Sequence, residues 1–234
     1  MKSSPAFWSL DGFALGARFG APLLPGMIAF GLAVGSTAAA KGLTLVESIL
    51  LNGLVYAGLS QMAALGVWPG EMTASAILGL ALLVFTVNSR LLLAGAGLQP
   101  WLGTLPAWQV YPTLYLLTDP GWIISMRYRA EGGADAAIIL GSGLLFYSFW
   151  MAATTVGYLA GSLVPDPKAV ALDLVVPVFF AAMLVPLWRG PRRAFAWAVA
   201  GIVALAFYYL VDGWWYVIAG SVAGIVTGGF VDDD

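Results

Sequence analysis

The chain has 234 residues, 61% of them hydrophobic and only 9% charged, and its formal net charge is -2. An ordinary soluble domain is about 45–50% apolar and about 25% charged, so these few charges do not cover a water-facing surface. The composition predicts an integral membrane protein, and the lack of a basic excess argues against nucleic acid as a partner. The sequence contains no Cys and no His, which excludes thiolate and His-ligated metal sites and the Ser–His pair of many hydrolases. We therefore expect no enzyme activity, no cofactor and no metal.

A transmembrane helix needs about 20 mostly apolar residues. This length predicts an all-α, polytopic bundle that forms a single transporter domain over residues 1–234. The expected spans run over residues 19–40, 48–68, 74–97, 108–126, 136–162, 170–188, 194–211 and 214–230. Seven spans remain an alternative, because Asp119-Pro120-Gly121 interrupts the fourth span and the last two are separated by a very short connection.

The distribution of Lys and Arg predicts the orientation of these spans. With the amino terminus inside, the inner segments hold seven Lys or Arg residues and the outer loops hold two. Cytoplasmic segments of membrane proteins carry the excess of positive charge. We therefore expect both termini in the cytoplasm.

The first span contains Pro22 and Pro25 close together, followed by Gly26. Two prolines in one turn cannot keep all the hydrogen bonds of a helix. The pattern predicts a discontinuous first helix whose backbone N–H groups near Gly26 face a solute, as broken helices do in transporters. A simple proline kink is the alternative.

Several charged or polar side chains fall within or at the ends of apolar spans. A charge at the bilayer centre costs about 2.5–3.5 kcal/mol on insertion scales, so such residues usually face a cavity or a partner. The group comprises Glu47, Asn52, Gln61, Asn88, Arg90, Asp119 and Asp173. For Arg90 we expect contact with a substrate carboxylate, or else an ion pair with Asp119 or an interfacial position. For Asp119 and Asp173 we expect a role in proton coupling, or else in helix capping.

Glycines recur at a spacing of four residues in three places: Gly12-Gly16-Gly20, Gly157-Gly161 and Gly220-Gly224-Gly228. This spacing lets helix backbones approach closely. We expect these faces to serve helix packing, with the partner of the last set left open.

In the order and spacing of its motifs, the chain resembles the AzlC-type branched-chain amino acid permeases, the large subunits of two-component bacterial exporters. The motifs are Pro22 to Gly35, Tyr56-Ala57-Gly58-Leu59-Ser60-Gln61-Met62, Asn88-Ser89-Arg90 with Pro100, Leu117-Thr118-Asp119, and Leu172-Asp173-Leu174. The resemblance implies export of hydrophobic amino acids, driven by protons, together with a small AzlD-like membrane subunit. Pro120-Gly121 stands where the family pattern has an acidic residue, which puts an acidic-pair proton mechanism in doubt.

We therefore expect a multi-pass permease of a bacterial inner membrane, with a passive channel or facilitator as the alternative. The expected substrate-binding residues are Gly26, Tyr56, Gln61, Asn88 and Arg90, and the expected proton-coupling residues are Asp119 and Asp173. The apolar part of the amino acid is expected among Phe30, Tyr56, Met62 and Phe85.

Overall fold

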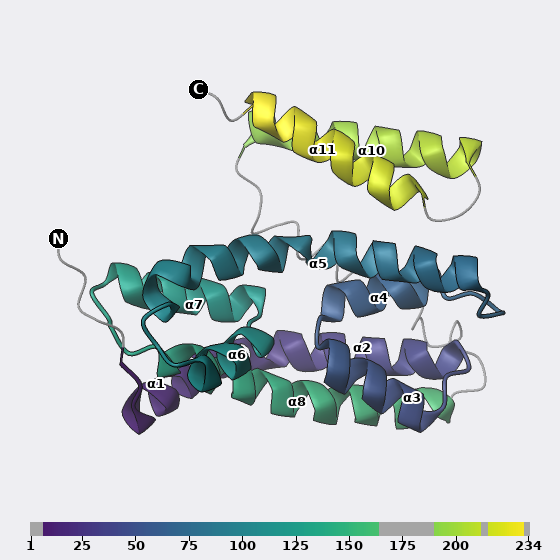
Figure 1. The fold of residues 1–234 in the computed structure, drawn as a ribbon. Helices are drawn as coiled ribbons and strands as arrows, with labels where there is room; N and C mark the ends of the chain where they lie inside the picture. The colour runs from purple at the N-terminus through teal and green to yellow at the C-terminus, as the bar shows by residue number, and fades with distance from the viewer. Residues whose placement is uncertain (1–6, 164–189, 212–214, 232–234) are drawn as a thin grey trace. The chain divides into compact units, whose positions relative to one another are not determined.

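A computed structural model describes residues 7–163, 190–211 and 215–231 of the chain (Figure 1). These residues form helices with short connections, and their one β-type contact is an isolated bridge between Phe7 and Asp135. The all-α prediction is confirmed. The helices group into two compact units, one within Met1–Met62 and Asn88–Leu172 and the other within Ala63–Val87 and Asp173–Asp234. The single transporter domain stays a prediction.

The helices follow the predicted spans in order. The first span, expected at 19–40, corresponds to a 3₁₀ turn η1 (Ala21–Leu23) and α2 (Leu24–Ala40), and the helical segment begins earlier than expected, with α1 (Leu10–Gly20). The second corresponds to α3 (Leu45–Leu50), a π-helix η2 (Leu51–Val55) and α4 (Gly58–Gly66), and the third to α5 (Ala74–Leu102). The fourth is divided into α6 (Ala107–Tyr115) and α7 (Asp119–Ala130), and the fifth is α8 (Ala137–Ser162). The last two are α10 (Pro191–Leu210) and α11 (Trp215–Val231). The sixth predicted span, with Asp173, lies outside the described residues.

Three helical segments of the described chain have the length of membrane spans, and apolar side chains cover much of the helix surface. Among the described residues, three helical segments are long and apolar enough to cross a bilayer: Leu10–Ala40, Ala74–Leu102 and Ala137–Ser162. Large apolar side chains are widely exposed on the helices, including Leu92 and Leu93 on α5 and Leu210 on α10. Lipid tails solvate such surfaces where water would not. The protein is therefore a multi-pass helical membrane protein, and α10 and α11 are two separate helices, as the eight-span prediction expects.

Helix α8 is the centre of the first unit and packs against α1, α2, α3, α6 and α7 (Figure 1). Its crossings with α1 and α2 run through glycines, because a Cβ added at Gly16, Gly35 or Gly157 would overlap the backbone of the facing helix. In the second unit, Gly220 and Gly224 face small residues of α10. The packing role predicted for the glycine spacing is confirmed, and the last set serves a partner within the chain.

The buried core of the first unit joins the second half of α5 to the start of α8. It contains Leu98, Trp101 and Leu102 from α5 together with Ile138 and Ile139 from α8, all at most 4% exposed. This core anchors the part of α5 that follows Arg90.

The proline-rich turn of the first span changes the helix type without ending the helical run. Leu10–Ala40 forms one helical segment, and Pro22 and Pro25 each lie in the first turn of an element, where the missing N–H group is tolerated. Gly26 is exposed within α2, and a Cβ added there would meet no atom within 4 Å. The predicted discontinuity is thus a local 3₁₀ turn, and the backbone does not open at Gly26.

Glu47 is explained by local structure. It forms a capping box with Thr44 at the start of α3, in which the Thr44 N–H donates to Glu47 Oε2 at 2.7 Å and the Glu47 N–H donates to Thr44 Oγ1 at 3.2 Å. The carboxylate is exposed and caps a helix.

Candidate substrate site

The second span is broken between η2 and α4. The π-helix η2 ends at Tyr56, which has φ +40° and is the only non-glycine residue with positive φ in the described part of the chain. A left-handed conformation is unfavourable for a tyrosine, so the surrounding contacts must hold it there. Inside a membrane, the backbone groups freed by such a break need partners from the protein or from a bound solute.

Three side chains bind the carbonyl groups freed at this break. The Gln61 side-chain amide donates to the carbonyl oxygen of Leu51 at 2.9 Å. The hydroxyl groups of Tyr115 and Tyr147 both donate to the carbonyl oxygen of Gly53, the second at 3.2 Å. The break is therefore an ordered feature, fixed by residues of α4, α6 and α8.

Aromatic rings surround the break. Tyr56, Tyr115 and Tyr147 form what we call the tyrosine cluster, with ring centroids 4.9 Å apart for Tyr56–Tyr147 and 6.4 Å apart for Tyr56–Tyr115. Phe30 and Trp150 make an edge contact at 5.5 Å. A Cβ added to Gly58, the first residue of α4, would meet both of these rings, so the two rings cover the start of that helix.

A second break lies in the fourth span, between α6 and α7. Thr118 caps α7, its hydroxyl oxygen accepting the Gly121 N–H at 3.2 Å, and Asp119 is the first residue of the helix. An acidic residue in a first turn is stabilised by the helix dipole, and Pro120 is tolerated there. The break predicted at Asp119-Pro120-Gly121 thus falls just before Asp119.

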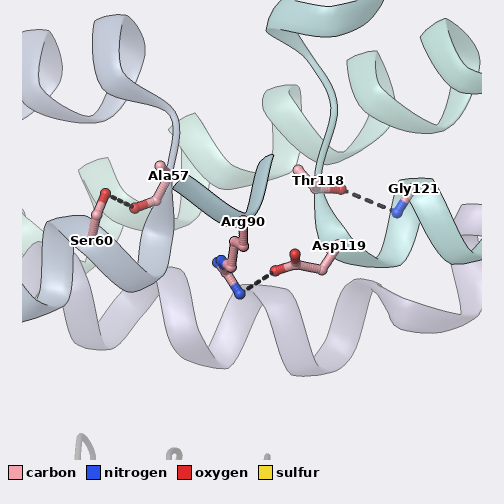
Figure 2. Close-up of polar contacts among 6 residues, drawn as sticks. All are labelled: Ala57, Ser60, Arg90, Thr118, Asp119 and Gly121. Atoms are coloured by element: carbon pink, nitrogen blue, oxygen red, sulfur yellow. Dashed lines mark hydrogen bonds and ion pairs between the residues drawn. The ribbon is translucent and has the colours of Figure 1, made fainter. Parts of the chain in front are cut away.

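Arg90 and Asp119 form an ion pair, with Arg90 Nη1 2.8 Å from Asp119 Oδ2 (Figure 2). Asn88 stands at the midpoint of the 29-residue helix α5, so Arg90 lies within one turn of the middle of that helix. The two side chains are 39% and 41% exposed, which leaves the pair accessible. In Figure 2 the guanidinium group lies between the first turns of α4 and α7. Both turns present the positive end of a helix dipole, an environment that favours an anion.

Not all polar atoms near the two breaks have partners. Among the described residues, four atoms of predicted site residues are buried without a hydrogen bond: the Tyr56 hydroxyl, Gln61 Oε1, Asn88 Oδ1 and Arg90 Nε. Asn52 Oδ1, in η2, is also buried without a hydrogen bond. Buried polar groups are nearly always satisfied in proteins, so these atoms need partners such as an ordered water or a bound ligand.

The structure brings most of the predicted site residues to the two breaks. Tyr56 and Gln61 lie at the first break, and Arg90 is joined to Asp119 at the second. Phe30 and Met62 are buried, as expected for an apolar lining, whereas Phe85 is 64% exposed on α5. Gly26 lies on an open helical surface, and Asp173 lies outside the described residues.

Sequence reasoning missed Tyr115 and Tyr147. A usable signal was present, because a phenol inside an apolar span needs a hydrogen-bond partner there. Tyr147 lies well inside α8, and Tyr115 is the last residue of α6.

Two broken helices and an ion pair within apolar segments are features that helical membrane transporters share. Residues 22–164 match the model of the AzlC family, described as AzlC protein, and this range contains both breaks and the ion pair. The chain belongs to the AzlC family, which confirms the resemblance seen in the sequence. It is also similar to an uncharacterized membrane protein of Archaeoglobus fulgidus, with 27% identity over 223 residues that cover 93% of this chain and 94% of the relative. No solved structure matches the chain.

Proposed function

We propose that the protein exports hydrophobic, branched-chain amino acids across a bacterial inner membrane, with both termini in the cytoplasm and a small AzlD-like subunit as its partner. The observation that carries this proposal is the Arg90–Asp119 ion pair, set near the middle of a membrane-spanning helix and beside two broken helices. A membrane transport family supplies the general role.

The charges of the pair match those of an amino acid zwitterion. When the pair opens, the Arg90 guanidinium group receives the substrate carboxylate through its planar fork of N–H donors. The Asp119 carboxylate receives the ammonium group. Because one internal ion pair is exchanged for two pairs to the substrate, much of the cost of separating the two side chains is offset. The apolar side chain of the substrate packs against Phe30, Tyr56 and Met62.

Asp119 also supplies the coupling to protons. A proton on Asp119 Oδ2 and a substrate ammonium group occupy the same carboxylate, so the two ligands exclude each other. A carrier that carries substrate outward and a proton inward in alternation is an exporter driven by the proton gradient. Gln61 and Asn88 line the route with side-chain amides.

The experiment is transport of labelled leucine in proteoliposomes with an imposed pH step, with and without the small subunit. The parent protein is expected to concentrate leucine, Arg90→Ala to abolish transport, and Asp119→Asn to keep downhill exchange while losing the response to pH. The matched control is Arg127→Ala, because Arg127 forms an exposed ion pair with Glu131 at 3.0 Å. Leucine that equilibrates without ever being concentrated by the parent would establish the passive channel instead.

A further inference from the structure

Two amide oxygen atoms at the first break are sealed from solvent and lack a donor. Asn52 is fully buried and Gln61 is 1% exposed. Within the described part of the chain, neither Asn52 Oδ1 nor Gln61 Oε1 has a hydrogen-bond partner, and the hydroxyl group of Tyr56, which is 6% exposed, has none either. All three belong to the stretch from η2 to α4 that contains the break.

The orientation of both amides is fixed by their nitrogen atoms. Asn52 Nδ2 donates to the carbonyl oxygen of Ser48 at 2.7 Å, and Gln61 Nε2 donates to that of Leu51 at 2.9 Å. A carbonyl group only accepts, so flipping either amide would set two acceptors against each other. The two oxygen atoms are therefore the amide atoms left without a partner in this stretch of the chain.

The break is flanked by helix ends of both signs: the first turn of α4, which favours an anion, and the carboxyl end of α3–η2, which favours a cation. The break follows the carboxyl end of α3–η2, and the carboxyl end of a helix carries the negative end of its dipole. Half-helix carboxyl ends and unwound carbonyl groups bind small cations in other membrane carriers.

The ligand set selects the kind of cation. The atoms available are neutral oxygens, and the described residues contain no cluster of three His, Cys, Asp or Glu side chains of the kind that holds a multivalent metal. Neutral carbonyl oxygens bind monovalent cations in channels and carriers. We propose that Asn52, Gln61 and the break at Tyr56 form a binding site for a small monovalent cation, separate from the Arg90–Asp119 pair.

The test measures cation binding to the purified full chain without any transport. The unfolding temperature is measured in detergent while NaCl is substituted stepwise for choline chloride at constant ionic strength. A parallel series substitutes methylammonium chloride for choline chloride. Binding to the folded state raises the unfolding temperature in a saturable way. Asn52→Leu and Gln61→Met, which keep size and remove the oxygen, are expected to weaken the apparent Kd at least about tenfold, as for the loss of one polar contact to a charge.

Conservative variants and a matched control separate binding from folding. Asn52→Asp and Gln61→Glu keep an oxygen and are expected to retain the response to the cation. Thr154→Val is the control, because Thr154 is 1% exposed and its hydroxyl group is already bonded to Trp150 at 2.9 Å. A response to Na⁺ assigns the site to an alkali ion, and a response to methylammonium alone assigns it to an ammonium group.

The proposal is overturned if neither cation raises the unfolding temperature of the parent. It is also overturned if the cation raises the unfolding temperatures of Asn52→Leu and Gln61→Met with the same apparent Kd as for the parent and for Thr154→Val. Because no outcome depends on leucine transport, the failure of this proposal is distinguishable from the failure of the proposed export.

Discussion

The side-chain amide of Gln61 and the carbonyl oxygen of Leu51 are joined by a hydrogen bond of 2.9 Å across the break at Tyr56, ten residues apart in the chain. A helical hydrogen bond would have satisfied that carbonyl if the second span had continued unbroken. The side chain replaces the backbone donor, so the break persists in a medium that offers no water. Gln61 thus has a structural role besides the ligand role of its oxygen.

Removal of the Gln61 amide is expected to destabilise the protein. In Gln61→Met, the Leu51 carbonyl loses its donor, which costs about 1–3 kcal/mol for a buried acceptor. The expected fall in unfolding temperature is about 2–4 °C per kcal/mol. Trp fluorescence of the purified protein during heating measures it. Gln99→Met is the control, because Gln99 is exposed at the end of α5. Equal unfolding temperatures for the two variants would contradict the structural role.

The hydroxyl groups of Tyr115 and Tyr147 are expected to act together. Both donate to the Gly53 carbonyl, so Tyr115→Phe or Tyr147→Phe alone leaves that acceptor with one donor. Only the double variant leaves it unsatisfied. The double variant is therefore expected to lose more stability than the sum of the single variants, with a coupling of about 0.5–3 kcal/mol.

Chemical or thermal unfolding of the parent, the two single variants and the double variant measures the coupling free energy. Tyr111→Phe is the matched control, because Tyr111 lies on the same helix as Tyr115 and is 72% exposed. Strictly additive losses would show that the two hydroxyl groups do not share the Gly53 acceptor.

The apolar segments made most of the helices predictable from the sequence. A span must bury about 20 apolar residues in lipid, and this requirement is local, so the fifth span, expected at 136–162, is the helix Ala137–Ser162. The break before Asp119 was also predictable, since Thr118 and Pro120 are a helix cap and a first-turn residue by their own chemistry.

The break at Tyr56 was not predictable in this way, because its cause is not local. Two of the three donors that stabilise it are Tyr115 and Tyr147, which lie 62 and 94 residues from Gly53 in the sequence. The opposite case is Pro22 and Pro25, which predicted an open backbone. Each proline lies in the first turn of its element within the continuous run Leu10–Ala40, and a local 3₁₀ turn accommodates the missing N–H groups. Whether a proline opens the backbone depends on its position within a helical element. The sequence alone did not reveal where the elements of this segment begin.

Gly35 and Gly26 are expected to respond in opposite directions to the same substitution. A Cβ at Gly35 would overlap the Thr154 carbonyl oxygen where α2 crosses α8, so Gly35→Ala is expected to cost about 1–3 kcal/mol through overpacking. Gly26→Ala adds a methyl group to an exposed helical position with open space, and is expected to gain up to about 1 kcal/mol from helix propensity. The unfolding temperatures of both variants check this, and a loss of stability in Gly26→Ala would argue against the open helical surface.

Asp135 is expected to hold the amino-terminal segment to the start of α8. This carboxylate is only 4% exposed, and it accepts the Ser9 N–H at 3.2 Å, the Ala137 N–H at 3.0 Å and the Ser9 hydroxyl group. Hydrogen bonds to a charged group are worth about 1.5–3 kcal/mol. Asp135→Ala is therefore expected to destabilise the protein and to release the segment that precedes α1.

Limited proteolysis of the segment before α1, followed by mass spectrometry, measures that release. Glu131→Ala is the control, because Glu131 is exposed and its side chain pairs with Arg127. Ser9→Ala is expected to have a smaller effect than Asp135→Ala, since the Ser9 N–H and the Ala137 N–H still bind the carboxylate. Cleavage is thus expected to be fastest in Asp135→Ala and slower in Ser9→Ala. Glu131→Ala is expected to be cleaved at the rate of the parent. Cleavage of Asp135→Ala at the parent rate would mean that the backbone bonds of Phe7 to Ala134 and Ala136 hold the segment without the carboxylate.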